Sequence, residues 1–128
     1  MWLYRTSGDT DKPIVLYDYQ PNRRASNPRN FLNGFHGYLH TDGYSGYHNL
    51  PENITIVGCW AHARRKFDEA VKSLPQNKAK GSSAAQGLAY CTRLFEMEKD
   101  LADFSPDDRY VQRLEQEKPV LDAFLAWA

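Results

Sequence analysis

The pair Asp42-Gly43 is the part of the sequence best suited to chemistry, because an acidic residue directly follows the strand-like run Tyr38–Thr41. A carboxylate at the exposed end of a strand is a hard oxygen ligand of the kind that Mg²⁺ and Mn²⁺ prefer. Two-metal phosphoryl-transfer sites gather several such carboxylates from different elements. Asp-Gly is also typical of ordinary turns. From residue type alone, Asp42 is therefore either a turn residue or a metal ligand.

Asp18 is the other carboxylate near a predicted strand end, between Tyr17 and Tyr19. It could be a second metal ligand that acts together with a carboxylate from another element. The alternative is a structural ion pair with Arg23 or Arg24, which follow a few residues later.

Cys59 and His62 form a C-x-x-H pattern, and both residue types bind zinc. A structural zinc site needs four ligands, and the other cysteine, Cys91, lies in the predicted helical tail. The alternative is a Cys59 that packs as a small apolar side chain, with His62 at the start of a helix.

Two groups of cations are candidates for phosphate binding, since arginine and lysine both donate to phosphate oxygens. Consecutive residues cannot share one helical face, so some of the second group must point away from a core. The alternative for both groups is a solvated surface. The groups are Arg23, Arg24 and Arg29, and Arg64, Arg65 and Lys66.

The composition excludes several classes of protein. The chain has 128 residues, which is one domain's worth, with 41% hydrophobic and 25% charged residues. Sixteen basic and sixteen acidic residues cancel, which excludes a uniformly basic nucleic-acid binder but permits a local basic face. Apolar runs are too short for a membrane span, and no secretory pattern follows Met1. With two cysteines, we expect a reduced, cytoplasmic setting without membrane contact.

The sequence pattern before residue 61 predicts strands with short connections. A turn is expected over residues 7–13, and the first two strands could form a hairpin. Asn27 is expected to cap a short helix with Pro28 at its first position, and this helix would end before Gly34. The expected strands are Trp2–Thr6, Ile14–Tyr19, Tyr38–Thr41 and Ile54–Trp60, with a helical turn over Tyr44–Leu50 and a helix over Ala61–Leu74.

The tail reads as a helical hairpin after a linker at residues 75–83. Ser82 or Ser83 is expected to cap the first long helix, and Ser105 the second. Pro119 lies inside the second helix and should kink or split it.

Four segments together resemble the central part of insertion sequence 66 transposases, in matching order and spacing. The tail segment Lys118–Trp127 is similar to the helical segment that follows in that family. The resemblance covers nearly the whole chain. The four segments are Tyr17–Arg23, Phe31–Gly37, Asp42–Tyr47 and Gly58–Phe67.

The resemblance implies a DDE-type recombinase that holds two Mg²⁺ or Mn²⁺ ions with two aspartates and a glutamate. Asp42 would be the second aspartate, and Cys59 and His62 match a C-x-x-H signature of uncertain role. The implied fold is α/β (α+β), an incomplete ribonuclease-H-like sheet of about four strands with short helices, followed by a helical hairpin. The implied division is a partial catalytic core at 1–74, a linker at 75–83 and a helical insertion at 84–128.

The resemblance also implies that the other two catalytic acids lie outside the chain, before Trp2 and beyond Ala128. We therefore expect a transposase fragment that is inactive alone, holds no metal stably and meets DNA through its parent protein. A missing central strand would leave an open sheet edge where a homodimer could form. The alternatives are a non-catalytic DNA-binding remnant and a module that binds the transposase.

Overall fold

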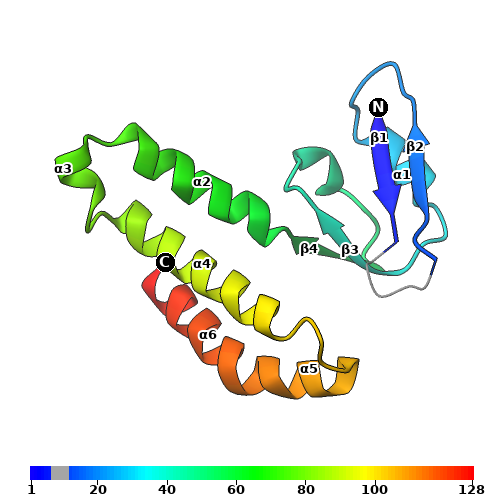
Figure 1. Cartoon of the computed structure of the whole chain (residues 1–128). Coiled ribbons are helices and arrows are strands. Elements are labelled where there is room, and N and C mark those ends of the chain that lie inside the picture. Colours follow the sequence, from blue (N-terminus) through cyan, green and yellow to red (C-terminus); the bar gives the residue numbers. More distant parts are fainter. Residues whose placement is uncertain (7–11) are drawn as a thin grey trace. The chain divides into compact units, whose positions relative to one another are not determined.

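The computed structural model describes residues 1–6 and 12–128, which form two compact units (Figure 1). The first unit is Met1–Cys59 and the second is Trp60–Ala128. This division lies earlier in the chain than the linker expected at residues 75–83. The helix that follows Cys59 therefore belongs to the helical unit, whereas the sequence placed it with the strands.

The first unit begins with an antiparallel hairpin of β1 (Trp2–Arg5) and β2 (Val15–Asp18). Trp2 pairs with Asp18 and Arg5 with Val15, and the amide of Thr6 donates to the carbonyl of Ile14 at 3.0 Å. The expected hairpin is confirmed. The turn expected over residues 7–13 falls largely outside the described residues.

The two faces of this hairpin differ in burial. Trp2 is 4% exposed, and the ring of Tyr4 stacks on Phe31 with 3.8 Å between centroids. On the opposite face, Leu3 and its cross-strand partner Tyr17 are both exposed. All apolar residues of β2 are exposed, so neither face of this strand is covered in the described chain.

Helix α1 (Ser26–Phe31) begins earlier than the sequence predicted. Ala25, not Asn27, is its N-cap residue, and the Asn27 side chain instead donates to the carbonyl of Asn22 at 2.9 Å. Pro28 is then the third helical residue, which is tolerated because the first amides of a helix have no partner within it. Gly34 follows with φ of 82° and ends the segment as expected.

The second pair of strands, β3 (Gly37–Thr41) and β4 (Ile54–Gly58), is parallel. Their connection contains the single 3-10 turn η1 (Ser45–Tyr47), where a longer helical turn was expected. Among the described residues, this pair and the hairpin are separate two-stranded sheets. The expectation of one sheet of about four strands is therefore corrected, because no described strand lies between the pairs to join them.

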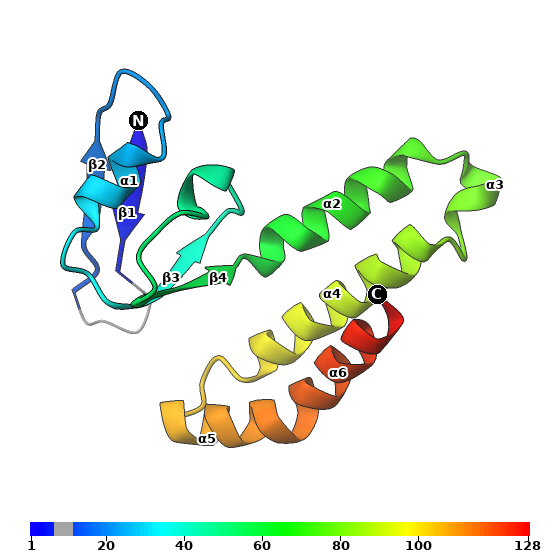
Figure 2. The same ribbon diagram turned by 180° about the vertical axis from the view of Figure 1, so that it is seen from behind.

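The second unit consists of helices that lie side by side (Figures 1 and 2). Helix α2 (Trp60–Ser73) starts directly after Cys59, so the strand predicted to reach Trp60 ends at Gly58. The predicted linker contains the short helix α3 (Gln76–Ala79). Ser82 caps α4 (Ser83–Asp100), as expected, by accepting from the amide of Ala85 at 3.1 Å.

The last helical segment is divided, as Pro119 led us to expect. It runs through α5 (Pro106–Gln112), the π-helical turn η2 (Arg113–Glu117) and α6 (Lys118–Trp127). Proline cannot donate and its ring crowds the carbonyl four residues earlier, so the wider turn lies directly before it. At the start of α5, Ser105 accepts from the amide of Asp108 at 3.2 Å, which confirms the predicted cap.

Phe124 of α6 lies at the centre of the aromatic core in the helical unit. Its ring centroid is 5.5 Å from that of Trp60, 6.2 Å from Phe67 and 5.7 Å from Tyr90. Because these partners lie on α2 and α4, the aromatic residues of the tail hold all three long helices together.

Gly87 of α4 allows α2 to approach closely, because a Cβ there would lie 2.3 Å from Cε1 of Phe67. We expect Gly87→Ala to lower the free energy of unfolding by about 1–3 kcal/mol through overpacking, although alanine favours helix. Urea unfolding measures the effect. Gly58→Ala is the control, since nothing lies within 4 Å of that Cβ. Equal stability of both variants would contradict the close approach.

Candidate functional site

Asp42 lies at the carboxyl end of β3, and its side chain is exposed. Its Oδ1 accepts from the amide of Tyr44 at 3.0 Å, and Gly43 between them has φ of 82°. The two readings of Asp-Gly are thus compatible, since the carboxylate closes a turn and still faces solvent.

Cys59 lies beside Asp42 along the sheet edge. Thr41 is the register partner of Gly58, and the two strands are parallel. The next residues, Asp42 and Cys59, therefore leave the sheet side by side at its carboxyl edge, where sites in open parallel sheets are usually built.

An aromatic cluster holds the loop after Asp42. Tyr44 and Tyr47 lie against Trp2, with ring centroids 5.9 and 5.6 Å away. The guanidinium of Arg23 lies 4.3 Å from the centroid of the Tyr44 ring, and the Tyr44 hydroxyl donates to the carbonyl of Arg23 at 2.8 Å. Core packing of the two tyrosines is therefore their role within the described chain.

The charges of the strand-end carboxylates Asp18 and Asp42 act on the pKa values of two tyrosine hydroxyls. Burial, followed by the charges of Tyr47 and Asp18, raises the pKa of Tyr4 to about 12. Burial and then Asp42 also raise the pKa of Tyr47, while Arg23 lowers it. Both tyrosines are thus held neutral close to acidic groups.

Asp18 has a local partner of its own. Both of its carboxylate oxygens accept from Nε2 of Gln20 at 3.1 Å. This partner replaces the ion pair with Arg23 or Arg24 that the sequence offered as the structural alternative. Across the part of the chain that the structure describes, no three His, Cys, Asp or Glu side chains are grouped to hold a metal ion.

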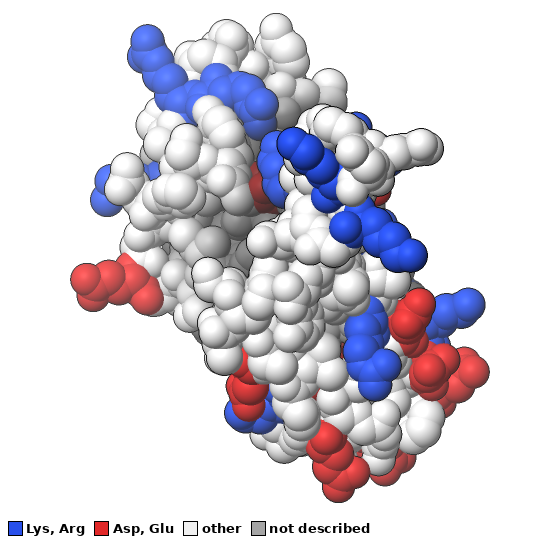
Figure 3. All heavy atoms as spheres, turned by 90° about the vertical axis from the view of Figure 1, so that its left-hand side faces the viewer, with Lys and Arg blue, Asp and Glu red and all other residues white. Residues whose placement is uncertain are grey.

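The basic residues of α2 differ in their contacts, although Arg64 and Arg65 both line one groove between α2 and α4. Arg64 points to α4, where its Nε donates to Oγ1 of Thr92 at 3.4 Å. Lys66 pairs with Glu69 at 3.6 Å and stays largely exposed, and Arg65 is exposed. On the face drawn in Figure 3, the blue side chains occur in small groups, with red ones beside several of them.

The C-x-x-H residues lie on either side of the start of α2. Cys59 is a free thiol and half-buried, and His62 lies in the first turn of the helix with Nδ1 buried. Cys91 is fully buried on α4, and burial raises the pKa of its thiol despite the nearby Arg64. Among the described residues, these groups form no metal-binding cluster.

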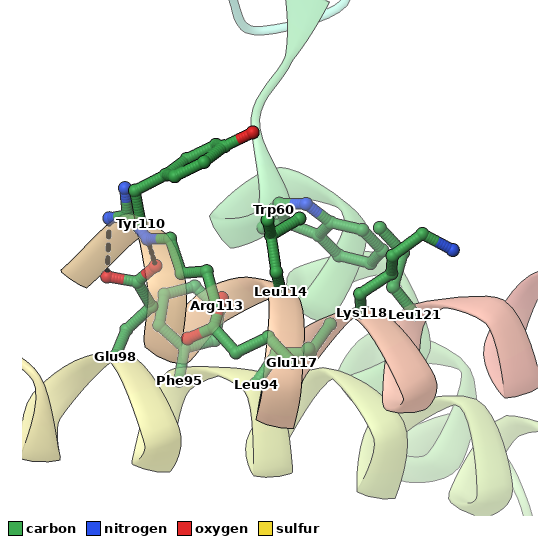
Figure 4. Close-up of a pocket in the computed structure, with 10 residues that line it drawn as sticks. All are labelled: Trp60, Leu94, Phe95, Glu98, Tyr110, Arg113, Leu114, Glu117, Lys118 and Leu121. Carbon is green, nitrogen blue, oxygen red and sulfur yellow. Dashed lines mark hydrogen bonds and ion pairs between the residues drawn. The ribbon is translucent and has the colours of Figure 1, made fainter. Parts of the chain in front are cut away.

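An apolar groove of about 470 Å³ lies within the helical unit (Figure 4). Its walls come from Trp60 of α2, Phe95 of α4, Leu114 of η2 and Leu121 of α6. No local sequence pattern indicates this groove, because its lining residues are spread over about sixty positions and meet only through packing.

Charged side chains border the groove at the π-helical turn. Arg113 donates to Glu98 through Nε at 2.6 Å and through Nη2 at 2.9 Å. These bonds lower the pKa of Glu98. Burial and the charge of Glu98 raise the pKa of Glu117. The pKa values of the two glutamates are therefore shifted in opposite directions.

This pair predicts a pH dependence of stability. Glu117, with its raised pKa in the folded chain, stabilises fully at low pH, and this contribution is lost as pH rises through that pKa. Glu98, with its lowered pKa in the folded chain, stabilises the fold at pH values above the ordinary pKa of glutamate. This contribution is lost as pH falls through the lowered pKa. In Glu117→Gln, we expect the loss of stability on raising the pH above the ordinary pKa of glutamate to disappear, as measured by urea unfolding at several pH values.

The exposed neighbour Glu115 provides the control for this experiment. Glu115→Gln should keep the pH profile of the unchanged chain. An unchanged decline in stability with rising pH in Glu117→Gln would show that Glu117 is not the group responsible.

The comparisons with known proteins identify the family of the chain. A sequence model described as "Transposase IS66 family" matches residues 1–128. The chain therefore belongs to the IS66 transposase family. No solved structure matches the chain.

Two relatives come from Sinorhizobium fredii (strain NBRC 101917 / NGR234), and both carry the name of an uncharacterized protein. The protein y4hP is 31% identical over 144 residues, which cover 99% of this chain and 26% of the relative. The protein y4qI is 31% identical over 135 residues, with 94% and 24% coverage. The chain thus spans about a quarter of the length of these relatives.

None of the described helices combines the length and apolar character needed to cross a membrane.

Proposed function

We propose that the chain is a piece of the catalytic region of a DDE-type transposase, whose complete protein cleaves and transfers DNA strands with divalent metal ions. Family membership over residues 1–128 supports the transposase origin. The observation that carries the catalytic part is the exposed Asp42 carboxylate at the carboxyl end of a parallel strand. In the complete protein, the strands of the first unit would belong to a larger, ribonuclease-H-like sheet.

Asp42 suits the role of one Mg²⁺ or Mn²⁺ ligand. It is a hard oxygen donor, and it is exposed, with Oδ1 oriented by the amide of Tyr44. The metals of such a site would activate water or a DNA 3′-hydroxyl and stabilise the leaving oxygen. Cys59 leaves the sheet beside Asp42 at the same edge.

The residues of this chain would hold only part of the metal site and would not carry out the whole reaction. The resemblance assigns two further acids to segments outside residues 1–128, so Asp42 would be one acid of three. We therefore expect the 128-residue chain alone to leave DNA intact.

The test of the proposed reaction uses a full-length transposase that contains this chain, with Asp42→Asn. Replacing a carboxylate ligand by an amide weakens metal binding, so we expect strand cleavage to fall by at least about a hundredfold. DNA affinity should persist. A gel assay with Mn²⁺ and labelled transposon ends measures the cleavage.

The matched control is Glu52→Gln, which changes an exposed carboxylate between η1 and β4. It should cleave normally. Normal cleavage by Asp42→Asn, or Mn²⁺-dependent nicking by the 128-residue chain alone, would overturn the proposal.

A second candidate function is DNA binding without catalysis, which the exposed cations Arg65 and Lys66 favour. If both contact phosphates, Arg65→Gln with Lys66→Gln should reduce the slope of log affinity against log salt by about 2. Fluorescence anisotropy with a labelled duplex and no metal measures this slope. Lys78→Gln with Lys80→Gln is the control, and equal effects would indicate non-specific attraction.

We further propose that the parent protein acts in the bacterial cytoplasm, associated with the nucleoid while on DNA. Pairing of a second copy at the open edge of the β1–β2 hairpin is the assembly that its unpaired backbone would permit. After DNA and a second copy of the chain, the third proposed partner is the parent transposase, which the helical unit would bind.

A further inference from the structure

The loop after β3 and the segment after β2 are joined by two contacts between the same two residues. The Arg23 guanidinium lies over the Tyr44 ring at 4.3 Å, and the Tyr44 hydroxyl donates to the Arg23 carbonyl at 2.8 Å. We propose that this Arg23–Tyr44 clasp orients the carboxylate of Asp42, which makes Arg23 a positioning residue and not a phosphate contact. The inference rests on the proposed role of Asp42.

The clasp reaches Asp42 through the backbone of Tyr44. The Tyr44 amide donates to Oδ1 of Asp42 at 3.0 Å, so fixing Tyr44 also fixes one carboxylate oxygen. An exposed aspartate would otherwise sample several rotamers, which a metal ligand must lose on binding. Tyr44 is thus held by Arg23 on one side and holds Asp42 on the other.

The spacing of the segment Asp42–Tyr47 fits this arrangement. Gly43 has φ of 82°, a conformation that favours glycine and turns the chain between Asp42 and Tyr44. A Cβ on Gly46 would lie 2.5 Å from Cε1 of Tyr44, so glycine leaves the space that the ring occupies. Tyr47 then packs on Trp2 of the hairpin. Both glycines therefore serve the placement of Tyr44.

The adjacent arginines consequently have different tasks. Arg23 also lies 6.0 Å from the centroid of the Trp2 ring, so its planar guanidinium is engaged by two aromatic faces. Arg23 and Arg24 are both exposed residues, but the contact of Arg24 with Asn22 is made by its backbone amide and not by its guanidinium. Arg24 is therefore the member of the pair that remains for a phosphate.

Amide hydrogen exchange of the 128-residue chain, measured by NMR, tests the clasp. In Arg23→Gln, we expect the Tyr44 amide to exchange about two- to fivefold faster, in line with the loss of one cation–π contact. The amides within β1 and β2 should be unchanged. Tyr44→Phe should give the same local effect, and Arg23→Lys should restore most of the protection because it keeps the cation.

Arg24→Gln is the matched control and should exchange like the unchanged chain. Faster exchange throughout β1 and β2 in Arg23→Gln would indicate a general structural role and overturn the positioning role. Unchanged protection of the Tyr44 amide in both Arg23→Gln and Tyr44→Phe would overturn the clasp itself.

A second measurement distinguishes the two arginines on DNA. With a labelled duplex, the slope of log affinity against log salt should stay constant in Arg23→Gln and fall by about 1 in Arg24→Gln. A fall of about 1 in Arg23→Gln would identify Arg23 as a phosphate contact and overturn the inference. If the unchanged chain binds no duplex, the DNA-binding part of the proposed function fails, while the exchange experiment still decides the clasp.

Discussion

The burial of Trp2 is the interaction on which the first unit depends. A two-stranded hairpin is marginal on its own in water, and so is a pair of parallel strands. Tyr44 and Tyr47 pack on Trp2 from the β3–β4 connection, and Trp2 is 4% exposed as a result. This contact joins two sheets that share no ladder among the described residues. It also fixes the loop that carries Asp42.

The helical unit follows a different principle. Its aromatic residues meet at Phe124, so the last helix contributes the centre of the core. The same helix carries a π-helical turn before Pro119. That turn places Arg113 and Glu117 at one border of the apolar groove, where Arg113 pairs with Glu98 of α4 (Figure 4). Pro119 thus affects both the geometry of the helix and the placement of charged residues at the border of the groove.

Local patterns predicted much of this structure, because they depend on neighbours along the chain. The serine caps at Ser82 and Ser105 are hydrogen bonds within three residues. Contacts between residues far apart in the sequence were harder to predict. The position of α1 depends on a bond from Asn27 to Asn22, and sheet pairing depends on strands far apart. Asp42 was identified from its place after a strand, whereas the contact of Arg23 with Tyr44 spans 21 residues and left no local pattern.

The exposure of β2 has a consequence for handling the isolated protein. The run Ile14–Tyr19 combines high β-propensity with a single charge, Asp18, and contains no proline. Its apolar side chains face water on both sides of the strand. Such segments pair with copies of themselves when chains are crowded. Yield on refolding from denaturant should therefore depend on protein concentration, and dilute solutions will favour the native chain over fibrous or amorphous precipitate.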